Sequence, residues 1–209
     1  MQPVLKFTGL LVVFNLVLSF SVGANEMGQS LEYRDALIKS HGHILLQLSK
    51  NIELQQILIE ADHRESSLMS IILKDLHWKE DDKARNKITN NSVSKLFELL
   101  IGSSKASFSE FMLTDAFGSL LASFPVTSDY WQGDERKFIQ PIKRQGLYIS
   151  DPNWDDSTNV YSFFLSIPIM NNQDLLGVLV AGIDVSSEYM MNMSLQDLLN
   201  LPAQENLLK

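Results

Sequence analysis

Hydrophobic positions in the first half of the chain recur at helical spacing. The first such stretch carries them at Leu37, Ile44, Leu45, Leu48 and Ile52. Because residues three and four apart share one face of a helix, this spacing predicts a long amphipathic helix, and no proline interrupts the chain between residues 23 and 124. Two more helical stretches follow, over residues 68–76 and 93–100, and Gly102 is a suitable end for the second of these.

After residue 105 the hydrophobic spacing changes from helical to alternating. Residues 111–115 alternate and lead into the tight turn Asp115-Ala116-Phe117-Gly118, and residues 118–124 return as a second strand. An aspartate can accept hydrogen bonds from the turn backbone, and a glycine tolerates the positive φ that a chain reversal often needs. We therefore expect a β-hairpin. A polar connection follows, with a short helix near residues 135–139 and a brief strand at residues 147–150.

The last two strands have the clearest patterns. Residues 160–169 alternate with a period of two, which is typical of a strand with unlike faces. Residues 175–183 are apolar on both faces, which places that strand in the middle of a sheet covered on both sides. Helices followed by antiparallel strands indicate an α+β fold. We expect a helical lead-in over 30–102, a sheet region over 108–185 and a C-terminal helix over 186–201.

The first residues predict export rather than a fold element. Lys6 precedes the apolar stretch 7–22, and Val22-Gly23-Ala24 offers the small residues that a signal peptidase recognises. The stretch is shorter than the roughly 20 residues that span a bilayer. We expect a cleaved signal peptide over 1–24 and one periplasmic bacterial domain over 25–209. An uncleaved N-terminal anchor is the alternative.

Composition excludes several classes of function. The formal net charge of −8 disfavours nucleic acid as a partner, and the lack of cysteine excludes disulfides, thiol nucleophiles and Cys-bound metals. His41 falls in the apolar seam of the first helix while His43 faces elsewhere, so the two do not form a metal pair. There is no Gly-x-Ser-x-Gly elbow, His-Glu-x-x-His motif or phosphate-binding glycine loop. We expect a binding protein without catalytic activity, cofactor or metal.

Three segments together resemble the Cache (PDC) family of sensor domains. They are the hairpin sequence of residues 111–118, the closing strands Ile167-Pro168-Ile169 and Leu176 to Asp184, and the segment Val126-Thr127-Ser128-Asp129-Tyr130-Trp131-Gln132-Gly133-Asp134-Glu135, which is similar to one in stand-alone exported Cache proteins. The resemblance covers residues 31–188 and implies a PAS-like antiparallel sheet of about five strands. It also implies a long N-terminal helix packed along one face of that sheet and a ligand pocket on the other.

The resemblance further implies a small polar ligand, namely an amino acid, an amine or a carboxylate. Tyr130 and Trp131 are candidate pocket residues, because large amphipathic rings in a polar loop offer apolar area together with an O–H or N–H group. The alternative is that these rings anchor the loop to the core. Tyr148 is a further candidate ligand contact.

Asp184 ends the central strand, and the resemblance implies that it contacts an amine of the ligand. It could instead cap a following helix. Ser162 and Trp154 complete the candidate set. Residues 151–156 have oxygen-bearing side chains at alternate positions, as at the start of a calcium loop, but Asp156 stands where that loop requires glycine. We expect a solvated turn there, with Trp154 closing over the pocket.

Three functions remain open at this point. The chain could be a sensor that signals through a separate membrane receptor such as a histidine kinase or a diguanylate cyclase. It could be a solute-binding accessory of a transporter, or a structural module with a vestigial pocket. The long front helix suits a homodimer or a receptor contact, and it equally suits packing on its own sheet.

Overall fold

The computed structural model describes residues 34–62, 67–103, 108–151, 153–155, 158 and 160–184. The predicted signal peptide (1–24) and the predicted C-terminal helix (186–201) lie outside these residues. Within them, no helix is both long enough and apolar enough to cross a membrane.

The helices come first along the chain, and most of the strands follow. The helices are residues 34–48, α2 (Ile52–Asp62), α3 (Leu68–Leu76), α4 (Asp82–Thr89), α5 (Ser92–Ser103) and α6 (Arg136–Arg144). The strands are β1 (Phe108–Asp115), β2 (Leu120–Phe124), β3 (Tyr148–Ile149), β4 (Asn153–Asp155), β5 (Val160–Asn171) and β6 (Asp174–Asp184).

The strands form one antiparallel sheet in the order β2-β1-β6-β5-β3, and β4 also pairs with β5. The strand β6 lies in the middle of the sheet, between β1 and β5, and it is buried along most of its length. The predicted α+β fold, with about five strands and a central apolar strand, is confirmed.

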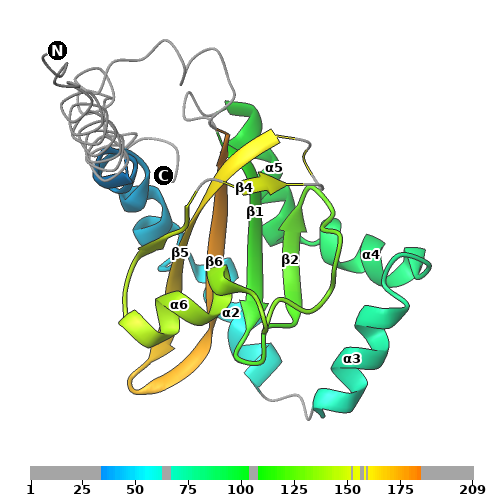
Figure 1. The fold of residues 1–209 in the computed structure, drawn as a ribbon. Helices are drawn as coiled ribbons and strands as arrows, with labels where there is room; N and C mark the ends of the chain where they lie inside the picture. The colour runs from blue at the N-terminus through cyan, green and yellow to red at the C-terminus, as the bar shows by residue number, and fades with distance from the viewer. Residues whose placement is uncertain are drawn as a thin grey trace, which may run out of the picture.

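Helices cover the two faces of the sheet unequally (Figure 1). Residues 34–48, α2 and α5 pack on one face, which is called here the first face. The core on the first face includes Leu37, Leu45, Leu48, Leu58, Phe97, Leu165 and Leu179. The second face carries α6 and the loop before it, while α3 and α4 lie beyond the edge strand β2 (Figure 1). The core of the second face includes Trp78, Met112, Phe138, Val178 and Val180.

The hairpin between β1 and β2 has the turn chemistry that its sequence predicts. The Asp115 carboxylate accepts hydrogen bonds from the backbone N–H groups of Phe117 at 2.9 Å and Ser119 at 2.8 Å. Gly118 has a φ of 84°, which a residue with a side chain rarely adopts. The turn places β2 against β1 and lays residues 130–132 beside it, since Gln132 N donates to Gly118 O at 2.8 Å.

The predicted long front helix is in fact two helices, which corrects the sequence prediction. The first ends at residue 48, and α2 begins at Ile52. The Asn51 side chain accepts hydrogen bonds from the N–H groups of Glu53 and Leu54, so it caps the new helix. Ile52 is consequently 79% exposed and does not continue the apolar seam. An asparagine cap can start a new helix without proline or glycine.

Two other segments differ from the sequence prediction. The predicted solvated turn over residues 151–156 contains β4, which pairs with β5. The charged segment after α3 forms the helix α4. The Asp81 carboxylate caps its first turn by accepting a hydrogen bond from Ala84 N at 2.9 Å. Both elements are short and polar, and neither has the hydrophobic periodicity from which helices and strands were predicted.

Candidate functional site

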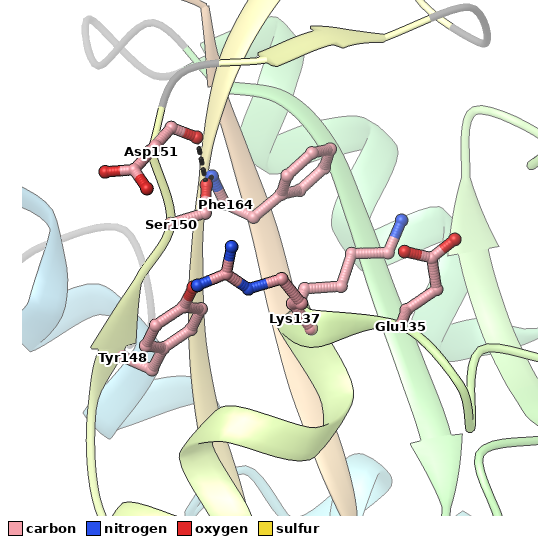
Figure 2. A pocket seen from close by; sticks show the side chains of 7 residues that line it. Glu135, Lys137, Tyr148, Ser150, Asp151 and Phe164 are labelled. Atoms are coloured by element: carbon pink, nitrogen blue, oxygen red, sulfur yellow. Dashed lines mark hydrogen bonds between the residues drawn. The ribbon is translucent and has the colours of Figure 1, made fainter.

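A cavity of about 270 Å³ opens on the second face of the sheet, between the start of α6 and strands β3 and β5 (Figure 2). It is called here the α6 cavity. Its lining residues are Glu135, Arg136, Lys137, Tyr148, Ser150, Asp151 and Phe164. Small-molecule sites commonly measure roughly 300–1,000 Å³. At about 270 Å³, the α6 cavity lies just below that range.

Ser150 holds the β3 wall of the α6 cavity against β5. Its backbone N–H donates to Phe164 O at 2.9 Å, and its hydroxyl oxygen accepts from Phe164 N at 2.9 Å. The same hydroxyl donates to Asp151 O at 2.7 Å. These bonds continue the pairing beyond the two residues of β3 and hold the Phe164 backbone beside the cavity.

Cations lie over the aromatic rings of this region. The Lys137 ammonium is 4.5 Å from the centre of the Phe164 ring, and the Arg144 guanidinium carbon is 5.0 Å from the centre of the Tyr148 ring. The negative face of an aromatic ring attracts a cation at such distances. Both cations remain partly open to solvent, so their charge is available to an anionic group of a guest.

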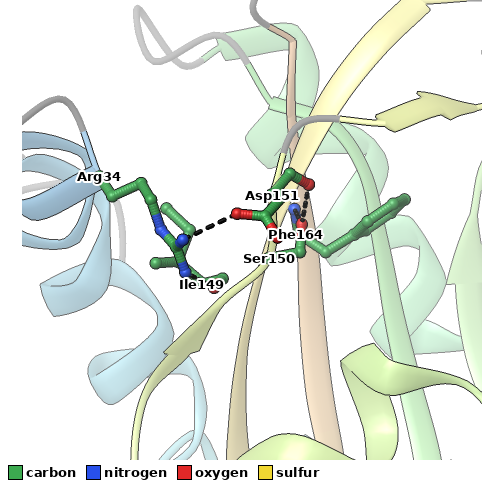
Figure 3. Close-up of polar contacts among 5 residues, drawn as sticks. All are labelled: Arg34, Ile149, Ser150, Asp151 and Phe164. Carbon is green, nitrogen blue, oxygen red and sulfur yellow. Dashed lines mark hydrogen bonds and ion pairs between the residues drawn. The ribbon is translucent and has the colours of Figure 1, made fainter. Parts of the chain in front are cut away.

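Arg34 joins the α6 cavity to the helix of residues 34–48, called here the front helix (Figure 3). Its guanidinium pairs with the Asp151 carboxylate at 2.8 Å and donates to Ile149 O at 2.7 Å. One arginine therefore connects the helix of residues 34–48 to the end of β3 and to a lining residue of the cavity. The helix that packs on the first face thus has a direct polar contact with the wall of the site on the second face.

The structure distributes the six residues predicted from the sequence over several places. Tyr148 lines the α6 cavity. Ser162 and Asp184 face each other across β5 and β6, and the Ser162 hydroxyl lies 3.1 Å from that of Ser109. Trp154 lies on β4, and its side chain is outside the described residues.

Tyr130 and Trp131 lie at the opposite edge of the sheet from Tyr148. The Tyr130 ring is buried beside Trp78, with 5.4 Å between ring centres. The Trp131 indole donates to Phe117 O at 2.8 Å, which holds it against the β1–β2 turn. These two side chains do not line the α6 cavity, although the loop that carries them leads directly into α6.

Asp75 on α3 fixes this loop from outside the sheet. Its carboxylate oxygen accepts hydrogen bonds from Tyr130 N at 2.7 Å and from Trp131 N at 2.9 Å. The Trp78 indole adds a bond to Thr127 O at 2.9 Å. Hydrogen bonds to a charged acceptor are stronger than neutral ones, so Asp75 is the main polar anchor of the segment that precedes α6.

Replacing Asp75 with alanine is expected to lower the free energy of unfolding by about 2 kcal/mol, because two backbone N–H groups lose a charged acceptor. Asp75→Asn keeps an acceptor oxygen and should lose less. Urea denaturation followed by tryptophan fluorescence measures both. Asp82→Ala is the control, since Asp82 is exposed and pairs with Arg85 on the surface. Equal losses in Asp75→Ala and Asp82→Ala would contradict this role.

No family model matches the chain, and no curated protein matches it. Solved structures do match it. They are ligand-binding domains of bacterial chemoreceptors, which are Cache-type sensor domains.

Three of these matches illustrate the similarity. A Campylobacter jejuni chemoreceptor domain in complex with L-norvaline is 18% identical, with a TM-score of 0.40, over 82% of this chain and 62% of that chain. The same receptor's domain with isoleucine bound is 15% identical, with a TM-score of 0.40, over 84% and 65%. The domain of a Pseudomonas aeruginosa amino acid chemoreceptor in complex with GABA is 14% identical, with a TM-score of 0.37, over 78% and 61%. The chain thus spans less than two thirds of the length of these domains, and the similarity is one of fold.

Several residues around the α6 cavity were not among the sequence candidates. Arg136 and Lys137 follow Asp134 and Glu135 at the start of a predicted helix, and this switch from acidic to basic residues is a signal that could have drawn attention to them. Arg34 had no such signal, because its contacts are more than a hundred residues away in the chain. Among the described residues, no group of three or more His, Asp or Glu side chains is placed to hold a metal ion.

Proposed function

We propose that this chain is an exported sensor domain that binds a small charged metabolite, above all an amino acid, in the α6 cavity. The observation that carries this proposal is the presence of both signs of charge around one aromatic-lined cavity. Figure 2 shows Glu135 and Lys137 on the α6 side and Ser150 and Asp151 on the opposite side. A zwitterion presents an ammonium and a carboxylate, and such a wall can bind both groups.

The binding is proposed to be non-catalytic and to be reported by a membrane partner. Arg34 supports this proposal, since it connects the cavity wall to the front helix through Asp151 and Ile149. A guest that competes with Arg34 for the Asp151 carboxylate would weaken the contact between the helix of residues 34–48 and the cavity wall. The partner would be a receptor such as a histidine kinase or a diguanylate cyclase. Export to the periplasm is proposed on the pattern of residues 1–24.

A homodimer through the front helix would have to use its outer side. Leu37, Leu45 and Leu48 are fully buried against the sheet, whereas Leu46 is 42% exposed. The predicted apolar seam therefore packs on the chain's own sheet, and dimer formation stays a proposal.

The test is a thermal-shift and calorimetric screen of the purified chain with L-amino acids, GABA, primary amines and carboxylates. A ligand at a hundredfold excess over its Kd should add about 2.7 kcal/mol to the stability. Lys137→Met, which removes the ammonium and keeps an apolar stem, should weaken a carboxylate-bearing ligand at least tenfold. Lys143→Met, on the exposed side of the same helix, is the matched control and should leave binding unchanged.

The same screen tests the residues proposed from the sequence. Asp184→Ala and Trp131→Ala are included, and an unchanged response in both variants would remove those residues from the site. If no compound shifts the melting temperature, or if Lys137→Met binds as tightly as the native chain, the proposed function fails. The first of these outcomes would favour a structural module with a vestigial pocket.

A further inference from the structure

A second cavity, of about 230 Å³, lies beside the edge strand β2, away from the α6 cavity. It is called here the β2-edge cavity. Five parts of the fold enclose it, namely α2, α3, α4, the β1–β2 hairpin and the loop of Tyr130. The lining residues used below are Ile57, Lys74, Lys87, Ile88, Leu120 and Tyr130. An adjoining open hollow shares Lys74 and Lys87 and adds Lys83.

The β2-edge cavity has an apolar floor and cationic groups at its rim. Ile57, Ile88 and Leu120 supply apolar surface from three different elements. The Lys74 ammonium lies 4.0 Å from the centre of the Tyr130 ring, which holds this cation at the rim. Within the described part of the chain, neither Lys74 nor Lys87 forms an ion pair. Two ammonium groups are therefore open to an anion, in a chain whose overall charge is −8.

The acidic residues near the two lysines are mostly engaged elsewhere. The Asp115 carboxylate holds the hairpin turn through Phe117 N and Ser119 N, and the Asp81 carboxylate caps α4. Glu60 on α2 is exposed and also lines the cavity. The Tyr130 side chain is buried. The cavity lining thus has two ammonium groups, Lys74 and Lys87, and one carboxylate, Glu60, without an ion pair among the described residues.

We propose that the β2-edge cavity is a second binding site, for a small organic anion with an apolar body such as a straight-chain monocarboxylate. The carboxylate is bound by Lys74 and Lys87, with the Tyr130 hydroxyl as a further donor. The alkyl chain lies on the floor formed by Ile57, Ile88 and Leu120. This site is independent of the α6 cavity, because the two share no lining residue.

The experiment is a calorimetric titration of the purified full chain with hexanoate, and with hexanol and hexylamine as neutral and cationic analogues of the same length. Hexanoate is expected to bind with one-to-one stoichiometry, hexanol at least tenfold more weakly, and hexylamine not at all. Lys87→Met should weaken hexanoate at least tenfold. Because Lys87 is exposed, this variant should fold normally. Lys74→Met should have a similar effect, and Tyr130→Phe a smaller loss.

Two control variants locate the site. Lys143 is exposed near the end of α6, so Lys143→Met should leave hexanoate binding unchanged. Lys137→Met alters the α6 cavity and should also leave hexanoate binding unchanged. This variant therefore distinguishes failure of the β2-edge site from failure of the proposed function. The proposal is overturned if hexanoate does not bind, if hexanol binds as tightly, or if Lys137→Met rather than Lys87→Met removes binding.

Discussion

Gly177→Ala is expected to destabilise the chain more than any other single methyl addition in the sheet. Gly177 lies on the central strand β6, opposite Asp115 of β1 and Ile169 of β5. A Cβ at this position would overlap the backbone carbonyl of Thr114 and lie 2.7 Å from the Leu58 side chain. The carbonyl belongs to the β-ladder and cannot move without breaking it. Overpacking a core commonly costs about 1–3 kcal/mol, and we expect a loss of at least about 3 kcal/mol here.

Guanidinium denaturation measured by circular dichroism tests this expectation. Gly102→Ala is the matched control, since a Cβ there meets no atom within 4 Å and the residue lies in α5. Removing the backbone freedom of a helical glycine should stabilise the control by about 0.5–1 kcal/mol. The two glycine-to-alanine changes should therefore move the denaturation midpoint in opposite directions. A Gly177→Ala midpoint equal to the native one would show that β1 and β6 can separate without cost.

Acid is expected to destabilise the chain through His41. This side chain is fully buried in the front helix, edge-on to the Phe108 ring with 5.2 Å between ring centres. Burial lowers the pKa of His41 from 6.5 to about 4, with a further lowering by nearby His43, although a hydrogen bond to Leu37 O acts in the opposite direction. The folded state therefore prefers the neutral ring, and Ser40 Oγ, 2.7 Å from its Nδ1, keeps that ring hydrogen-bonded.

The direction of the pH effect follows from this lowered pKa. In the unfolded chain the histidine binds a proton below about pH 6.5, whereas in the folded chain it does so only below about pH 4. The stability from His41 is therefore complete above pH 6.5 and is lost as the pH falls to 4. The difference in pKa corresponds to about 3 kcal/mol.

His41→Leu keeps an apolar side chain in the seam and should remove this part of the acid dependence. Urea denaturation at pH values from 7 to 4 gives the free energy of unfolding for native chain and variant. His77→Leu serves as the control, because His77 is exposed at the end of α3. If native chain and His41→Leu lose stability in parallel over this range, the buried ring is not the acid-sensitive group.

The hairpin and the two long strands could be predicted because their determinants are local. Asp115 and Gly118 carry the turn chemistry within four residues, and the alternation along β5 lies in a single stretch of chain. The break between the first helix and α2 was missed because an apolar residue, Ile52, continued the helical spacing by coincidence. Asn51 is a sufficient cap, but an asparagine in a sequence does not show whether its side chain bonds the backbone.

The candidate site was predicted less completely than the fold. Tyr148 lines the α6 cavity, and its contact with a ligand stays a prediction. Arg34, Lys74, Asp75 and Lys137 were not expected, because each acts through a partner that is distant in the sequence. A charged residue on a helix surface has the same local pattern whether it faces solvent or a loop more than fifty residues away.

By itself, the sequence of this protein determined the class of fold, the strand at the centre of the sheet and the turn between β1 and β2. These follow from side-chain polarity at fixed spacing and from backbone preferences, both of which act over a few residues. Only the tertiary structure decided that Tyr148 and Tyr130 open on different cavities and that Arg34 reaches the wall of the first. The physical reason is that a cavity forms where separate elements fail to fill the space between them. That depends on how the elements are packed, which local spacing does not encode.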